Sequence, residues 1–213
     1  MTIPLSKYYE LEDYEELAEE LNVVDQDFAK DSPQSPHRRW EYALAIRALD
    51  TWLETRRGRG TTGKVVDVGG AGSPFWRMIG ESTIVVDPHE NDTIAEYLDK
   101  APSLAQAVFC LSVLEHVEDL DPFLYHLSCL TAPGGLLFLT FDACACTDHL
   151  PEEDPHHFRW MRKRIFTPEC RGWLVEQLCE KYHFAPLGQI DYAPKPVQVY
   201  DYSFASLALI KRS

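Results

Sequence analysis

The sequence predicts a doubly wound α/β domain built on a mostly parallel sheet, and two observations carry this prediction. In the stretch 64–75, KVVDVGGAGSPF, a short apolar β-branched run breaks into a glycine-rich turn. Such a run is typical of a buried parallel strand. Further strand and helix patterns then alternate along the chain. Because ligands of such folds bind at the carboxyl ends of the strands, we expect the glycine turn to border a binding site.

Length and composition narrow the class of protein. The chain has 213 residues, of which 45% are hydrophobic and 25% charged, as in one globular domain. A net charge of −14 argues against nucleic acid as a substrate, because phosphate binding depends on a basic surface. No apolar run is long enough for a bilayer, and the first residues do not resemble a signal peptide. We therefore expect a cytoplasmic protein with no membrane partner.

The chain divides into a helical region over 1–60 and a main domain over 61–213. Apolar residues recur at helical spacing over Tyr8 to Leu21 and over His37 to Thr55, which predicts two amphipathic helices. The six cysteines lack paired CxxC spacing, which predicts free thiols.

An acid ends the second expected strand of the main domain. Asp87 follows the apolar run 83–86, and in nucleotide-binding α/β folds a carboxylate at this place accepts both ribose hydroxyls. It follows Gly69 by 87 − 69 = 18 residues, close to the roughly 20 residues expected of such a unit. The alternative is a surface turn residue before Pro88, and we favour the ribose role.

The glycine turn does not match two common nucleotide motifs. The stretch from Gly70 to Phe75 lacks the third glycine of G-x-G-x-x-G, and no Gly-Lys-Ser/Thr follows it. A nicotinamide-dependent dehydrogenase is therefore the weaker interpretation.

The motif Asp67-Val68-Gly69 resembles the first motif of class I S-adenosylmethionine-dependent methyltransferases, although Ala71 and Ser73 stand where that family has glycines. A second resemblance is an ordered series of pieces. It consists of a strand over 107–111, Ser112, Leu-Glu-His-Val over 114–117, a helix, Pro-Gly-Gly over 133–135 and a strand over 136–141. The resemblance covers about residues 64 to 210.

The resemblance implies a seven-stranded-type sheet closed by an antiparallel pair over 187–191 and 203–210, with the two N-terminal helices capping the pocket. Only 107 − 87 = 20 residues separate Asp87 from the next clear strand, so we expect a shortened third strand around 93–95. The implied cofactor is S-adenosylmethionine. The expected cofactor-binding residues are Arg38, Asp67, Gly69, Gly70, Ala71, Gly72, Asp87, Pro88, Thr93, Ile94, Leu111 and Ser112. For Arg38, a contact with the cofactor's carboxylate and a local charge pair remain equally open.

A methyl acceptor with an oxygen or nitrogen nucleophile needs a base. The long stretch 142–166 has no apolar period and carries Asp142, His149 and His157. A histidine, with a pKa of about 6.5, suits this task better than an aspartate of about 3.9, so we expect His157 to be the base and His149 its substitute. Asp142 would orient the acceptor, and His116 remains if neither loop histidine acts. The alternative is that the loop histidines are solvent-exposed.

We expect no metal site. Glu115 and His116 resemble part of the metal site of some small-RNA methyltransferases, but Ser112 replaces the first glutamate of that pattern. The expected function is O- or N-methylation of a small molecule. The alternatives are a non-catalytic cofactor-binding or partner domain and, less favoured, a metal-assisted RNA methyltransferase. A homodimer is left open.

Overall fold

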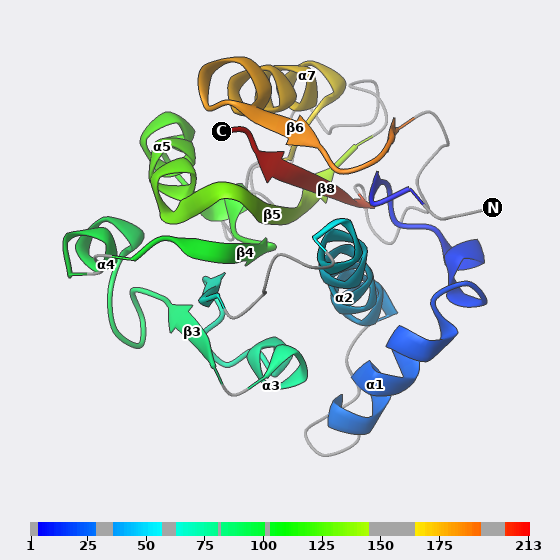
Figure 1. The fold of residues 1–213 in the computed structure, drawn as a ribbon. Helices are drawn as coiled ribbons and strands as arrows, with labels where there is room; N and C mark the ends of the chain where they lie inside the picture. The colour runs from blue at the N-terminus through cyan, green and yellow to red at the C-terminus, as the bar shows by residue number, and fades with distance from the viewer. Residues whose placement is uncertain are drawn as a thin grey trace, which may run out of the picture.

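The structure is a computed structural model that describes residues 4–28, 36–56, 63–80, 82–100, 103–144, 165–192 and 203–213. Within these residues a six-stranded sheet lies between two layers of helices (Figure 1). The strands, in spatial order, are β3 (Thr83–Val86), β2 (Val65–Val68), β4 (Ala105–Leu111), β5 (Thr131–Ala143), β8 (Ser203–Lys211) and β6 (Phe184–Pro186). The helices are α1 (Ala18–Phe28), α2 (Pro36–Thr55), α3 (Phe75–Ile79), α4 (Ile94–Lys100), α5 (Leu120–Leu130) and α7 (Pro168–Glu176). Shorter elements are β1 (Ser6–Lys7), β7 (Ile190–Asp191), η1 (Leu11–Tyr14), η2 (Leu114–His116) and the π-helical turn η4 (Gln177–Lys181).

The direction of the strands confirms the doubly wound α/β class. Strands β3, β2, β4 and β5 are parallel to one another, and β8 is antiparallel to both β5 and β6. The chain leaves β2 for β3 on one side and returns to β4 on the other. The strand order therefore reverses between β2 and β4, where open α/β sheets form their binding crevice.

Side chains alternate between the two faces of the sheet, as the strand geometry requires. Along β5, Leu136 and Phe138 enter the core beneath α2, whereas Leu137 and Leu139 enter the core on the α5 side. All four are fully buried. This pattern explains why the apolar run of β5 is continuous rather than alternating.

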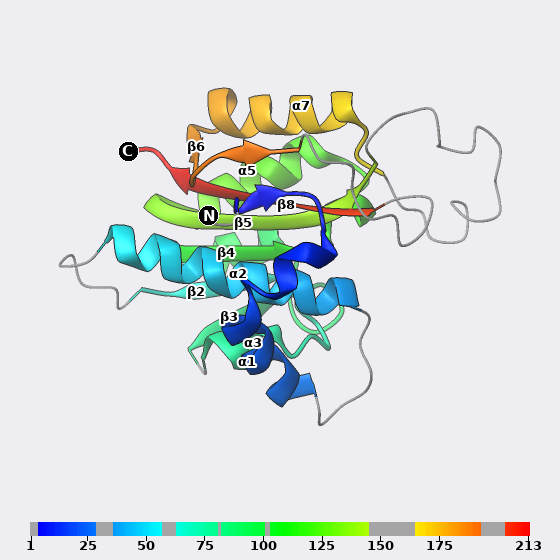
Figure 2. The ribbon, with the colours of Figure 1, turned by 90° about the vertical axis from the view of Figure 1, so that its right-hand side faces the viewer.

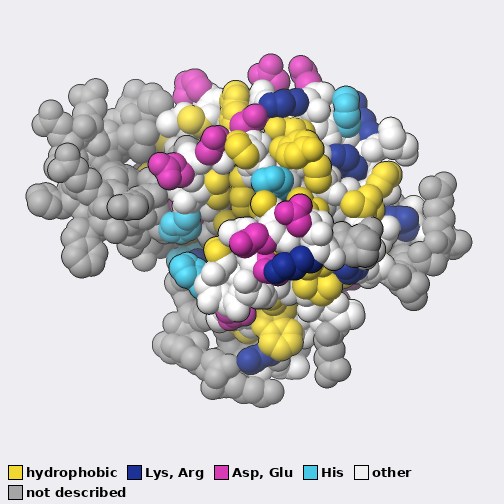
Figure 3. Space-filling model, turned by 90° about the vertical axis from the view of Figure 1, so that its left-hand side faces the viewer, with side chains coloured by type: hydrophobic (Ala, Val, Ile, Leu, Met, Phe, Trp, Pro, Cys, Tyr) yellow, Lys and Arg dark blue, Asp and Glu magenta, His cyan; other side chains and the backbone are white. Residues whose placement is uncertain are grey.

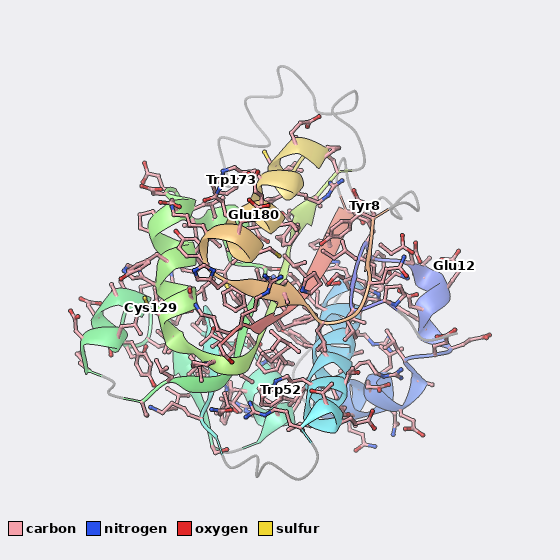
Figure 4. All side chains as sticks on the ribbon, turned by 45° about the horizontal axis from the view of Figure 1, so that its top comes forward. Tyr8, Glu12, Trp52, Cys129, Trp173 and Glu180 are labelled. Carbon is pink, nitrogen blue, oxygen red and sulfur yellow. The ribbon has the colours of Figure 1, made fainter. Side chains whose placement is uncertain are left out.

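Helix α2 crosses one face of the sheet and runs opposite to β4 (Figure 2). At its C-terminal end, Trp52 Nε1 donates a hydrogen bond to the carbonyl oxygen of Gly134 at 2.9 Å, near the start of β5 (Figure 4). Its first turn therefore lies at the opposite edge, where β4 ends. The helix predicted over 37–55 is confirmed.

The N-terminal segment contacts the part of the sheet that contains β8. Strand β1 pairs in parallel with β7, and Tyr8 forms a bridge to Ala205 of β8 (Figure 4). The guanidinium carbon of Arg171 lies 4.8 and 5.3 Å from the ring centres of Tyr8 and Tyr192, and Arg171 donates a hydrogen bond to the carbonyl oxygen of Phe166 at 3.1 Å. These contacts join the first residues of the chain to α7.

Three expectations are corrected. The residues around 93–95 form no third strand, because α4 begins at Ile94 and Thr93 accepts a hydrogen bond from the backbone N–H of Glu96 at 3.3 Å, as at a helix start. The described part of the sheet therefore has six strands. The first helix begins at Ala18 rather than Tyr8, with η1 and a turn before it. Of the stretch 187–191, only Ile190–Asp191 is a strand, and it pairs with β1, while β6 pairs with β8.

Thr167 caps α7, and its hydroxyl accepts a hydrogen bond from the backbone N–H of Cys170 at 3.3 Å. The cysteines in the described part of the chain are free. None of the described helices combines the length and apolarity that crossing a membrane demands.

Candidate functional site

The glycine turn after β2 forms one wall of the site. Gly69 has φ +78°, a value that favours glycine, and a Cβ at this position would lie 2.3 Å from Val113 Cγ2. Gly69 therefore lets the turn after β2 approach the turn after β4. Gly72 also has a positive φ, of +70°, but no heavy atom lies within 4 Å of its would-be Cβ.

Asp87 connects this turn to the end of β3. One oxygen of its carboxylate accepts a hydrogen bond from the backbone N–H of Ala71 at 3.0 Å, and the other from that of His89 at 2.8 Å. A carboxylate oxygen can accept more than one hydrogen bond, so both oxygens of Asp87 can also accept from ligand hydroxyls. The side chain is buried, which strengthens any contact it makes.

A cavity of about 590 Å³ lies beside Asp87, on the α4 and α5 side of the sheet edge. We call it the nucleoside cavity, after the part of the ligand that we propose for it below. Most of the lining side chains are apolar, and Figure 3, which faces this side, shows apolar side chains gathered among charged ones and histidines. The lining residues are Val68, Gly69, Val86, Asp87, Pro88, His89, Thr93, Ile94, Ser112, Val113, His116, Val117 and Phe123.

A second cavity, of about 210 Å³, adjoins the first on the α2 side of the same edge. We call it the amino-acid cavity, again after the part of the ligand that we propose for it below. It shares Gly69 and Ser112 with the nucleoside cavity. The lining residues are Arg38, Tyr42, Asp67, Gly69, Gly70, Ala71, Ser73, Leu111 and Ser112.

Asp67 places a carboxyl group in the wall of the amino-acid cavity. Its side chain is 2% exposed, and its Oδ2 has no hydrogen-bond partner within the described ranges. That oxygen occupies the space beside Gly70, where a Cβ would lie 2.3 Å from it. Burial, and then the nearby carboxylate of Asp87, raise the pKa of Asp67 to about 7. A buried acceptor without a donor is unusual, and it suits a ligand that brings a donor or a positive charge.

Arg38 supplies a positive charge from the first turn of α2. Its Nη1 donates to Glu41 Oε2 at 3.1 Å, and the charge of Glu41 raises the pKa of Arg38 despite burial. The cavity therefore has a guanidinium and a carboxyl group among its lining side chains. Tyr42 lies one turn further along α2, with its hydroxyl 2.9 Å from Ser73 Oγ.

Ser112 stands where the two cavities meet. It has φ 52°, which is uncommon for a residue other than glycine and costs of order 1–3 kcal/mol. Its backbone N–H donates to Thr140 Oγ1 at 3.0 Å, and its Oγ donates to Glu41 Oε1 at 2.8 Å. These bonds hold the strained conformation at the carboxyl end of β4. Strain of this kind is concentrated at functional sites.

The structure brings together most of the expected binding residues. Eleven of the twelve line one or both cavities, and Gly72 lies in the same turn without lining either. Of the expected catalytic residues, His116 lines the nucleoside cavity. Asp142 is fully buried near the carboxyl end of β5 and lines neither cavity. His149 and His157 lie outside the described residues.

The sequence interpretation did not identify Glu41 or Tyr42 as site residues. Both lie on the face of α2 that carries Arg38, at three and four residues from it. This helical spacing from Arg38 is the sequence signal that could have identified them. Among the residues that the structure describes, no group of three or more histidine, cysteine or acidic side chains is arranged to hold a metal ion.

Comparisons with solved structures identify the fold. The N-methyltransferase NodS from Bradyrhizobium japonicum WM9 is 14% identical and superposes with a TM-score of 0.51, over 84% of this chain and 99% of that one. An S-adenosylmethionine-dependent methyltransferase from Clostridium acetobutylicum ATCC 824 is 9% identical with a TM-score of 0.51, over 94% and 99%. The [4+2]-cyclase SpnF is 15% identical with a TM-score of 0.51, over 92% and 94%. No protein-family model and no curated protein sequence matches the chain. Likeness at these identities shows a common fold and no more.

Proposed function

We propose that this chain, which has the fold of class I S-adenosylmethionine-dependent methyltransferases, binds S-adenosylmethionine across its two adjoining cavities and transfers the methyl group to an oxygen or nitrogen atom of a small molecule. The observation that carries the proposal is the pairing of unlike cavities. One is largely apolar with a carboxylate at its end, and the other is lined by a guanidinium and a carboxyl group.

This pairing fits the chemistry of the cofactor, in which a nucleoside is joined through sulfur to an α-amino acid. In the proposal, Asp87 accepts the ribose hydroxyls and the apolar lining of the nucleoside cavity contacts the adenine. The unpartnered Oδ2 of Asp67 accepts from the ammonium group, and the Arg38 guanidinium meets the carboxylate. Gly69 and Ser112 line both cavities, so the sulfur would lie between them.

When bound, the cofactor supplies an activated methyl group. The chain's own contribution is to align the two reactants and exclude water, since such a displacement needs little else from the protein. A protonated acceptor additionally needs a base. Among the described candidates, His116 lines the nucleoside cavity and Asp142 is fully buried and lines neither cavity, so we retain His157, with His149 as its substitute, as the proposed base.

The acceptor is proposed to be a small molecule rather than nucleic acid because the net charge of −14 disfavours polyanions. One observation favours a second candidate function, a domain of this fold that binds the cofactor without methylating an acceptor. A solved structure with this fold is described as a [4+2]-cyclase, which is a different reaction.

Calorimetric titration tests the proposal. S-adenosylmethionine should bind at a single site, and NAD should not bind. Absence of S-adenosylmethionine binding, or binding of NAD in its place, would contradict the cofactor assignment. Transfer of labelled methyl to a panel of alcohol, phenol and amine acceptors then separates the two functions, because binding without methyl transfer to any acceptor class favours the second.

A further inference from the structure

Glu41 is a fully buried acid that the proposed function leaves without a role. It lies in the second turn of α2, is 0% exposed and does not line either cavity. Burying a carboxylate is costly unless it is paired and hydrogen-bonded. An acid at such a position therefore calls for an explanation, which we seek in the side chains that it contacts.

The carboxylate of Glu41 bridges two residues that line the amino-acid cavity. Its Oε2 accepts from Arg38 Nη1 at 3.1 Å, and its Oε1 accepts from Ser112 Oγ at 2.8 Å. Arg38 belongs to α2 and Ser112 to the turn after β4, 71 residues later than Glu41. One buried side chain thus connects the helix to the junction of the two cavities.

The partners of Glu41 are not equivalent. Burial raises the pKa of Glu41, and the charge of Arg38 and the hydroxyl of Ser112 oppose this rise. Arg38 makes no other hydrogen bond to a described residue, and 36% of its side chain is exposed. A guanidinium has five N–H donors in a fixed fork. With one nitrogen on Glu41, the fork is held in one orientation and its other donors remain for a ligand.

We propose that Glu41 is a positioning residue that fixes the Arg38 guanidinium in the amino-acid cavity, so that the chain selects ligands carrying an amino-acid group over nucleosides that lack one. The inference rests on the proposed function, because it assigns that cavity to the amino-acid half of the cofactor. It extends that function by naming which residue of α2 determines ligand selection. Glu41 itself touches no ligand.

Two ligands isolate this effect. S-adenosylhomocysteine and 5′-methylthioadenosine contain the same adenosine and a neutral sulfur, but only the first carries an amino-acid group. If Arg38 is no longer held in position, binding of S-adenosylhomocysteine should weaken and binding of 5′-methylthioadenosine should not change. A general loosening of the fold should weaken both.

The chain also offers a matched control on the same helix. Arg47 of α2 pairs with Glu20 of α1, with Arg47 Nη2 to Glu20 Oε2 at 3.0 Å. Glu20→Gln removes the carboxylate partner of an arginine on α2, as Glu41→Gln does. Unlike Arg38, however, Arg47 lines neither cavity. Glu20→Gln should leave the binding of both ligands unchanged.

The experiment is a set of calorimetric titrations with both ligands on the wild type, Glu20→Gln, Glu41→Gln, Arg38→Met and the double variant Arg38→Met/Glu41→Gln. Glu41→Gln should lower affinity for S-adenosylhomocysteine about tenfold, the size of one charged hydrogen bond, and change that for 5′-methylthioadenosine less than about twofold. Because Glu41 acts through Arg38, the double variant should bind S-adenosylhomocysteine no more weakly than Arg38→Met alone.

Several outcomes overturn the proposal: equal losses for both ligands, no loss for either, or a further loss in the double variant. If Glu41→Gln does not fold, Arg38→Met/Glu41→Leu leaves no buried charge unpaired and takes its place, with the same comparison against Arg38→Met. A wild type that binds neither ligand refutes the proposed function, and this inference with it. A wild type that binds both ligands equally well refutes the inference alone.

Discussion

The two cavities differ in how they are built, although they meet at Gly69 and Ser112. The nucleoside cavity lies on the α4 and α5 side of the sheet edge, is about 590 Å³ in volume and is mainly apolar. The amino-acid cavity lies on the α2 side, is about 210 Å³ and contains Arg38 and Asp67. The first is suited to bind by burial of surface, and the second by charge. Ligand binding in each cavity should therefore respond to different substitutions.

A substitution at Gly69, which lines both cavities, should weaken binding in both. Gly69→Val places a side chain within reach of Val113 and forces a β-branched residue to a positive φ. Both S-adenosylhomocysteine and 5′-methylthioadenosine should bind about 100-fold more weakly, as expected from an overpacking cost of about 3 kcal/mol. Calorimetry measures both affinities.

Gly72→Ala is the matched control, because it imposes a positive φ where nothing blocks the side chain. Its effect on either ligand should be much smaller than that of Gly69→Val. Equal effects would mean that backbone strain, and not the approach of the two turns, limits binding.

A change at the nucleoside cavity should weaken every ligand that contains ribose. Asp87→Ala removes the acceptor proposed for both hydroxyls and also frees the backbone N–H groups of Ala71 and His89. Affinity for both ligands should fall at least about tenfold, since hydrogen bonds to a charged group contribute about 1.5–3 kcal/mol each. Unchanged dissociation constants in a folded variant would remove Asp87 from the ribose site.

The amino-acid cavity should instead respond to pH. The pKa of Asp67 is raised to about 7 in the free protein, and a bound ammonium would lower it. The ligand-bound form then holds fewer protons, so affinity for S-adenosylhomocysteine should fall about fivefold from about pH 7 to about pH 6. The ligand's own ammonium stays protonated across that window.

Asp67→Asn should remove this pH dependence, and 5′-methylthioadenosine should not show it in the wild type. The same raised pKa affects the stability of the free protein. Because the folded state favours protonated Asp67, the stability that this proton contributes is present at low pH and is lost as the pH rises from about 4 through about 7. A melting temperature that rises across this window more in the wild type than in Asp67→Asn would contradict the assignment.

The smallest effect is expected at Tyr42. Tyr42→Phe removes a hydroxyl that lies 2.9 Å from Ser73 Oγ at the edge of the amino-acid cavity. One neutral hydrogen bond contributes about 1 kcal/mol, so S-adenosylhomocysteine should bind less than about tenfold more weakly. 5′-Methylthioadenosine, measured in parallel, should bind as before, and a loss for it would place Tyr42 beside the nucleoside instead.

Sequence patterns predicted the site residues at the strand ends better than those on α2, for a physical reason. Gly69 and Asp87 each follow a strand directly, and the ends of parallel strands meet at one sheet edge whatever the rest of the chain does. Glu41 and Tyr42 reach the site only because α2 packs across the sheet in one register. That register depends on contacts such as Trp52 with Gly134, which no local pattern specifies.

The wrong prediction of a third strand over 93–95 also reflects a limit of local patterns. The stretch after Thr93 was short enough for either a strand or a helix, and tertiary context decided in favour of α4. The central strands β4 and β5 were predictable because the runs 107–111 and 136–139 are apolar without interruption. The β1–β7 pair joins residues nearly the whole chain apart through two residues each, so its sequence signal is weak.

The central claim is that one ligand occupies both cavities, with its sulfur between Gly69 and Ser112. A crystal structure of the protein with S-adenosylhomocysteine tests it most directly. The account predicts ribose hydroxyls within hydrogen-bond distance of Asp87, the ammonium on Asp67 Oδ2 and the carboxylate on Arg38. A ligand bound with its amino-acid group outside the α2 side of the sheet edge, or at another place on the molecule, would contradict it.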